Sequence, residues 1–177
     1  MRSPCQQNIS YPKVSTPKEK EMDRVYRFNW RVDDFSISAF EDALKNFHAK
    51  DGFMYWRISG KKLEEKPLCI LWGSASKNPV NQQGIVGIGK VISERPEYFS
   101  SIAPNYLRSL SKYKNRYYVR VHFDTISLYK PLYSANYLRV KFKCLNNFSG
   151  CGGSSGYISP IINEEVYKLI TNKILSL

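Results

Sequence analysis

The three tryptophans of the chain are the side chains best suited to holding a flat ligand. Trp30, Trp56 and Trp72 each stand at the end of a predicted element. Polar residues lie near them in the sequence, namely Asn29, Asp33, Ser59, Ser74 and Asn78. A base rotated out of a nucleic-acid helix needs flat walls for stacking and a few polar groups for its edge. A methyl group on that base would favour an aromatic cage. Any one tryptophan taken singly is better explained as a core residue.

Positive charge is concentrated in the second half of the chain. The net charge is +12, and residues 101–146 hold nine Lys or Arg against one acid, Asp124. Residues 23–66 nearly balance, with nine basic and eight acidic residues. A polyanion is the natural partner, because neutralised phosphates release counterions, although a basic surface that only aids solubility is the alternative. The predicted phosphate contacts are Arg108, Lys112, Lys114, Arg116, Arg139 and Lys141.

Motifs for catalysis and for metal binding are weak. His48 and His122 lie far apart in the sequence without an acid partner pattern, and chance accounts better than function for a dyad with Cys151. Gly87-x-Gly89 lacks a third glycine and leads into a strand, so it is not a phosphate-binding loop. No C-x-x-C pair occurs among the cysteines at 5, 69, 144 and 151. The sequence therefore predicts no metal site, no cofactor and no catalytic residue.

Hydrophobic patterning predicts five or six strands. They cover residues 26–32, 53–59, 67–74, 84–93, 117–129 and 138–145, of which 53–59 could be a loop. Residues 67–74 are apolar throughout, as in a buried central strand. In 138–145 the side chains of Val140, Phe142 and Cys144 are expected to point inward, and Cys69 and Cys144 are interpreted as small core residues.

Two of these strands have irregular patterns. Glycines at 84, 87 and 89 indicate a bend, a bulge or a close backbone contact in one of them. The alternation in 117–129 slips at Thr125, which a β-bulge would explain.

Two helices are predicted from capping residues and apolar spacing. Residues 38–41 have the form of a capping box, and Phe40, Ala43, Leu44 and Phe47 fall at helical spacing. Asn163 is predicted to cap the last helix. The buried stripe of that helix would be Val166, Leu169, Ile170 and Ile174.

These elements predict an α+β fold, a curved sheet or small barrel flanked by helices. The length of 177 residues suits one domain, at 23–177, preceded by a flexible arm at 1–22. No run of 18 apolar residues occurs, so no membrane partner is expected. The polar N-terminus favours a cytoplasmic or nuclear, reducing compartment.

Three segments carry a family resemblance. They are residues 67–96 (PLCILWGSASKNPVNQQGIVGIGKVISERP), 54–59 (MYWRIS) and 156–170 (GYISPIINEEVYKLI). The first resembles the signature of EVE and YTH-type domains of the PUA-like superfamily: an apolar strand ending in an aromatic, a polar turn, a glycine-containing strand and a proline. The second resembles the place of the first cage tryptophan in YTH domains, and the third is similar to the EVE ending.

This resemblance implies a six-stranded, barrel-like sheet with a pocket for N6-methyladenine or a 5-modified cytosine. By position, Trp56 matches the cage tryptophan and Trp72 the aromatic that lines or backs the pocket. Asp33 and Asp34 fall where YTH domains bond the base edge, and Ser74 could do the same. The chain departs from YTH domains in lacking a tryptophan at 94–116. The predicted base-binding pocket comprises Trp30, Trp56, Trp72, Asp33 and Ser74.

The sequence thus favours a reader of a modified base over an enzyme. Modified DNA is slightly favoured, as in the DNA-reading part of McrBC-type restriction systems, and any cleavage would then belong to an effector nuclease or NTPase. A module that reads methylated RNA is the alternative. A small hydrolase or transferase that uses Cys151 or His122, and a protein-interaction module, are hypotheses of other classes.

Overall fold

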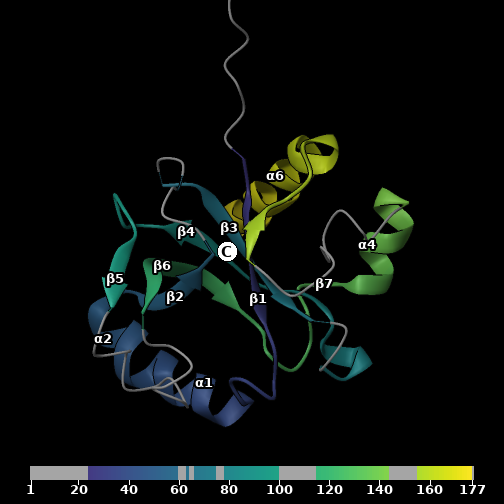
Figure 1. Ribbon diagram of the computed structural model, residues 1–177. Helices are drawn as coiled ribbons and strands as arrows, with labels where there is room; N and C mark the ends of the chain where they lie inside the picture. Colours follow the sequence, from purple (N-terminus) through teal and green to yellow (C-terminus); the bar gives the residue numbers. More distant parts are fainter. Residues whose placement is uncertain are drawn as a thin grey trace, which may run out of the picture.

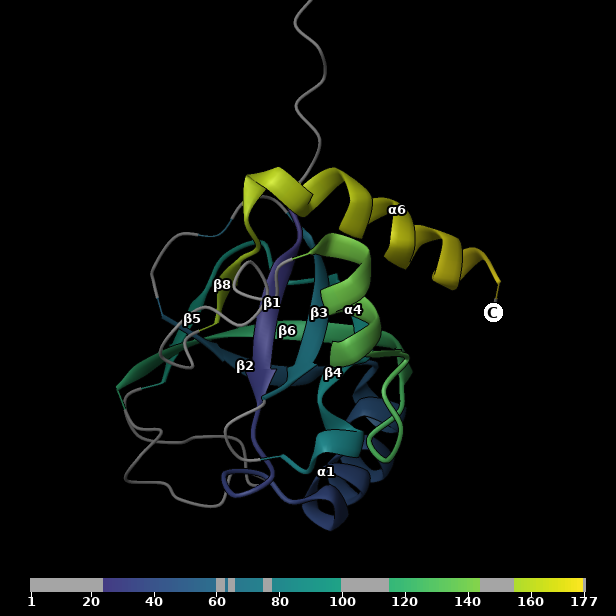
Figure 2. The same cartoon turned by 90° about the vertical axis from the view of Figure 1, so that its right-hand side faces the viewer.

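A strongly curled mixed sheet with helices on both of its faces forms the framework of the protein (Figure 1; Figure 2). The computed structural model describes residues 24–59, 63, 66–74, 78–99, 115–143 and 155–176. Within these ranges the predicted α+β class, with a curved sheet flanked by helices, is confirmed. The arm predicted at 1–22 lies outside the described residues.

The sheet has eight strands in the described part of the chain, six of them in one continuous path. The strands are β1 (Tyr26–Trp30), β2 (Met54–Ile58), β3 (Leu68–Gly73), β4 (Gly84–Val91), β5 (Glu97–Phe99), β6 (Arg116–Ile126), β7 (Tyr133–Ser134) and β8 (Gly156–Tyr157). The path runs β2-β6-β4-β3-β1-β8, with β5 paired to β6 and β7 paired to β4. Strands β1 and β3 are parallel, so both end at the same edge of the sheet.

The helical segments divide between the two faces. They are α1 (Ile37–Ala43), the π-helical η1 (Leu44–His48), α2 (Ala49–Asp51), the 3-10 turn η2 (Val80–Gln82), α4 (Ala135–Phe142) and α6 (Pro160–Leu175). Segments α1, η1 and α2 lie on one side of the curled sheet, whereas α4 and α6 lie together on the other (Figure 2). No helix in the described ranges is long and apolar enough to cross a membrane.

Both predicted helix starts need correction. Helix α1 is capped by Ser36, whose extended backbone lets its hydroxyl accept from the Ala39 N–H at 3.3 Å, and not by a box beginning at Ser38. Helix α6 starts at Pro160 after the capping residue Ser159. Asn163 lies inside that helix, where its Oδ1 accepts from the Val25 N–H at 2.8 Å and fixes the start of β1.

The segment predicted as a strand at 138–145 is helix α4 and the residue after it. Leu138 and Phe142 are both buried and stand four residues apart, as one face of a helix requires, whereas Val140 is 81% exposed. Ser134 accepts from the Tyr137 N–H at 3.2 Å and caps this helix. A spacing of four fits the period of a strand as well as that of a helix, which is why the alternating interpretation was wrong. Cys144 lies outside the described residues.

The irregularities predicted in β4 and β6 are present and belong to one feature. Gly89 pairs with Phe123 and Ile88 pairs with Thr125, so Asp124 is the extra residue of a β-bulge. The backbone of β6 passes so close to Gly89 that a Cβ there would overlap the carbonyl oxygen of His122.

Two apolar cores, one on each face of the sheet, hold the fold together. The inner core, under α1, includes Phe28, Trp30, Phe40, Met54, Cys69, Val119 and Val121. The outer core, under α4 and α6, includes Ile70, Trp72, Ile88, Leu138, Val166 and Ile170. Because successive residues of a strand point to opposite faces, Leu71 and Trp72 of β3 belong to different cores. The interpretation of Cys69 as a core residue is confirmed.

Candidate base-binding site

Trp56 is the one tryptophan of the three that is not fully buried. Trp30 is 1% and Trp72 is 2% exposed, whereas Trp56 is only partly buried, on the inner face of β2. Its ring centroid lies 5.7 Å from that of Phe40 and 6.0 Å from those of Phe28 and Phe123. Its indole N–H has no hydrogen-bond partner among the described residues. Trp56 therefore combines a rigidly held aromatic surface with an uncommitted donor.

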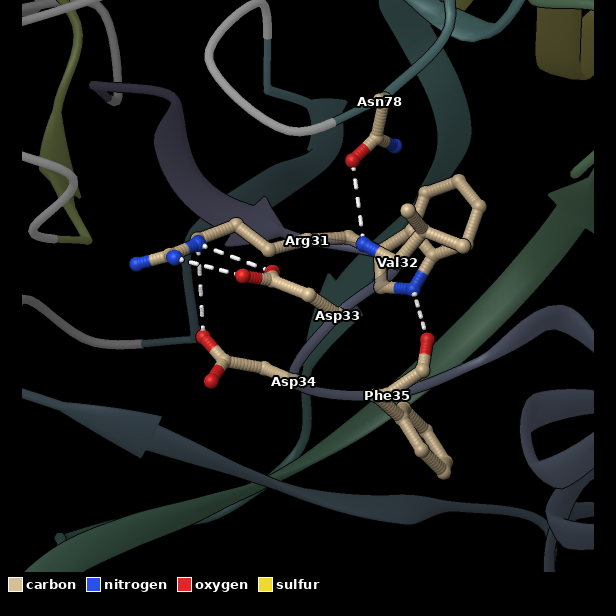
Figure 3. A network of polar contacts seen from close by, with 7 residues as sticks. Arg31, Val32, Asp33, Asp34, Phe35 and Asn78 are labelled. Atoms are coloured by element: carbon tan, nitrogen blue, oxygen red, sulfur yellow. Dashed lines mark hydrogen bonds and ion pairs between the residues drawn. The ribbon is translucent and has the colours of Figure 1, made fainter.

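The loop between β1 and α1 carries a compact group of charges. Arg31 binds Asp33 through two hydrogen bonds, from Nη2 to Oδ2 at 2.8 Å and from Nε to Oδ1 at 3.2 Å (Figure 3). The Nε of Arg31 also lies 3.5 Å from Asp34 Oδ2. Such an exposed pair adds little stability, but it fixes the direction of both carboxylates.

Backbone bonds anchor this loop to the parallel strand ends. The Val32 N–H donates to Asn78 Oδ1 at 3.0 Å (Figure 3), and the Ser74 N–H donates to the Trp30 carbonyl at 3.0 Å. The indole N–H of Trp30 donates to the Phe35 carbonyl at 2.7 Å. Trp30 and Asn78 are thus engaged in shaping the loop.

Phe35 connects the loop to Trp56. Its ring stacks on Phe40 with centroids 4.9 Å apart and lies 6.4 Å from the ring of Trp56. The structure therefore brings Trp56 close to the loop of Asp33 and Asp34, with Trp30 buried beneath them. It does not bring Trp72 to them, because Trp72 lies in the core on the opposite face. Sequence reasoning missed Arg31 and Phe35, although the spacing Arg-x-Asp-Asp was the available signal.

A row of aromatic rings extends the site along the inner face. Tyr26 lies 4.9 Å from Phe28 and 5.0 Å from the partly exposed Tyr157, measured between ring centroids. Burial raises the pKa of Tyr26 to about 12, so its hydroxyl remains a neutral donor. The guanidinium of Arg24 lies 4.8 Å above the ring of Tyr157. A cation therefore lies over the last aromatic ring at this end of the row.

The predicted phosphate contacts are divided between distant elements. Arg116 is exposed at the start of β6, and Arg139 and Lys141 are exposed on α4, beyond the opposite face of the sheet. Arg57, which the sequence analysis did not select, is exposed on β2. It directly follows Trp56 in this strand, so its side chain points to the other face. Arg108, Lys112 and Lys114 lie outside the described residues.

Two stacked histidines, His48 and His122, lie next to Phe123, whose ring also contacts that of Trp56. The rings of His48 and His122 are 5.1 Å apart and nearly parallel. His48 Nε2 accepts from the Phe123 N–H at 3.0 Å, and His122 Nδ1 lies 2.6 Å from the Gly52 carbonyl. Burial, reinforced by His122, lowers the pKa of His48, and Asp124 opposes this shift. The geometry thus holds His48 in the neutral form.

We expect this arrangement to make the protein less stable in weak acid. Because the pKa of His48 is lowered in the folded protein, its contribution is complete above the ordinary value of about 6.5 and is lost as the pH falls towards the lower, folded pKa. Protonation also removes the acceptor for the Phe123 N–H, which is worth about 1 kcal/mol. The check is the free energy of unfolding from about pH 7.5 to 5.5. The variant His48→Gln keeps an acceptor that does not titrate, so a slope equal to that of the wild type would contradict the assignment.

No cluster of three or more His, Cys, Asp or Glu residues that could hold a metal ion occurs in the described ranges. His122 does have an acid partner that its sequence pattern did not predict, because its Nε2 lies 3.7 Å from Asp124 Oδ1. Its Nδ1 is tied to the Gly52 carbonyl and its ring is stacked on His48. Cys151 lies outside the described residues.

Comparisons with known proteins gave one structural similarity. No protein-family model matches the sequence, and no curated protein matches it. Among solved structures, the YTH domain of Mmi1 in complex with RNA is similar, with a TM-score of 0.47 and 15% sequence identity, covering 86% of this chain and 82% of that chain.

Proposed function

We propose that this domain binds nucleic acid by taking one base against Trp56, and that it binds without catalysing a reaction. The observation that carries the proposal is the partly exposed Trp56, set among phenylalanines, of which Phe35 belongs to the loop that also holds Asp33 and Asp34. Stacking on an aromatic ring accepts any base, because every base has a π face. The net charge of +12 supplies the attraction for the phosphates.

The loop acids supply the polar part of this proposal. Arg31 directs Asp33 and Asp34, and Phe35 of the same loop lies 6.4 Å from the ring of Trp56. In this proposal the two acids accept from the edge of a base stacked on Trp56. Adenine and cytosine carry exocyclic amines that donate to a carboxylate, whereas the corresponding edges of thymine and uracil carry a carbonyl acceptor. The proposed preference is therefore for adenine or cytosine.

A methylated base fits this site better than an unmodified one. The rings of Phe28 and Phe40 next to Trp56 are fully buried, so the apolar contact for one methyl group comes from the partly exposed Trp56 itself. A single methyl or methylene in such surroundings is worth about 1–3 kcal/mol, or roughly 10- to 200-fold in affinity. We propose N6-methyladenine or 5-methylcytosine as the ligand, in DNA or in RNA, with any cleavage performed by a separate effector.

The proposal is tested by direct binding of the wild-type chain to labelled oligonucleotides. Matched DNA and RNA strands, single and paired, carry N6-methyladenine, 5-methylcytosine or no modification in one sequence context. We expect one modified base to bind about tenfold or more tightly than its unmodified counterpart. Equal affinity for all strands, with a steep fall as salt rises, would leave only a nonspecific basic protein.

A further inference from the structure

A groove between α4 and α6, on the outer side of the sheet, has the chemistry of a second nucleotide site. It has a volume of about 360 Å³ and is lined by Lys141, Glu165, Lys168, Leu169 and Asn172. Ligand sites commonly fall between about 300 and 1,000 Å³. Both helices pack on the outer core, whereas Trp56 belongs to the inner face, so the two sites lie on opposite faces of the sheet.

Two of the charged side chains that line the groove are not engaged in ion pairs with other described residues. Lys168 forms an ion pair with Glu164, one turn away on α6. Lys141 and Glu165 have no ion-pair partner among the described residues, although both line the groove. Helix α4 contributes Arg139 and Lys141 and no acid. A ligand that carries an anionic group and a hydrogen-bond donor would complement this lysine and this glutamate.

An exposed tyrosine stands beside the groove. Tyr137 is 46% exposed and lies one helical turn before Lys141, so both side chains are on the same side of α4. Its ring stacks on that of Tyr133 with centroids 5.7 Å apart and an angle of 25°. The hydroxyl of Tyr133 donates to the carbonyl of Leu169, which lines the groove, at 3.4 Å. This contact holds the tyrosine pair against α6.

We propose that this groove binds a nucleotide of a single strand, with the base on Tyr137 and the phosphate at Lys141. An aromatic face next to a basic side chain is the combination with which proteins hold single strands regardless of sequence. The inference rests on the proposed function, because it extends the nucleic acid bound at Trp56 around the edge of the sheet. It predicts that affinity depends on strand length.

The test compares two variants with the same change of charge. Lys141→Gln removes the cation in the groove, and Lys143→Gln removes a cation two residues further along, beyond the C-terminus of α4. With a single strand of about 16 nucleotides, Lys141→Gln should reduce the slope of log affinity against log salt by about 0.7 per lost phosphate contact, and Lys143→Gln should not. Tyr137→Leu should weaken the same strand about fivefold or more.

Strand length and a Trp56 variant separate the two proposals. Strands of about 4 nucleotides that carry the preferred base should bind Lys141→Gln and Tyr137→Leu like the wild type. Equal losses for Lys141→Gln and Lys143→Gln, or no loss for Tyr137→Leu with the long strand, would overturn the groove site. If Trp56→Leu alone loses affinity, the groove fails and the base site stands. If only the groove variants lose affinity, the base site fails. A wild type that binds no strand overturns both.

Discussion

The variant Gly89→Ala is expected to be destabilised by about 3 kcal/mol or more, because the added methyl group has no space. It would overlap the carbonyl oxygen of His122 and lie 2.8 Å from Phe123 Cα. Both are backbone atoms of β6, which cannot turn away as a flexible side chain can. The strands β4 and β6 would have to separate at the bulge, where the Phe123 N–H also donates to His48 Nε2. Thermal unfolding should show a midpoint lowered by about 6 °C or more.

Gly156→Ala is the matched control for this prediction. A Cβ at Gly156 would meet nothing within 4 Å, and its backbone is not in the left-handed region. The same chemical change should therefore alter the unfolding midpoint by less than about 2 °C, within the range of neutral surface substitutions. If both alanine variants unfold at the same temperature, the close approach of β4 and β6 at Gly89 is wrong.

The variant Trp56→Leu is expected to lose about tenfold or more in affinity for the preferred modified strand. Leucine keeps much of the apolar contact with Phe28, Phe40 and Phe123 but has no π surface for a base. Preference for the methylated over the unmodified strand should fall together with affinity, since one ring provides both. Fluorescence anisotropy titrations with the methylated and the unmodified strand give the two affinities, and their ratio gives the preference.

Trp72→Leu provides the comparison on the opposite face. Trp72 is 2% exposed in the outer core, so its replacement should cost stability of the order of 2–4 kcal/mol and leave the affinity of the folded protein unchanged. The two variants thus make the same substitution on opposite faces of the sheet. Trp56→Leu is expected to reduce affinity, and Trp72→Leu is expected to reduce stability. Loss of modified-base preference in Trp72→Leu, with Trp56→Leu unaffected, would move the site to the outer face.

Local patterns in the sequence were sufficient to predict most strands of the sheet. The apolar run at 67–74 became the central strand β3, because residues packed on both faces must be apolar in both phases. The slip at Thr125 and the glycine at 89 were visible because a bulge shifts the side-chain phase and a close approach excludes Cβ. Helix α4 was wrongly predicted as a strand. A short segment with buried residues four apart fits the period of a strand as well as that of a helix.

The sequence by itself determined that the chain is basic, rich in aromatic residues and built as α+β, since these follow from composition and periodicity. Only the tertiary structure decided which tryptophan meets solvent. Trp30, Trp56 and Trp72 look alike in the sequence, but the face of each is set by strand register and by the helices that cover it. The contact of Phe35 with Trp56 likewise depends on how the loop after β1 folds back towards β2. Such contacts between segments distant in sequence leave no local pattern to find.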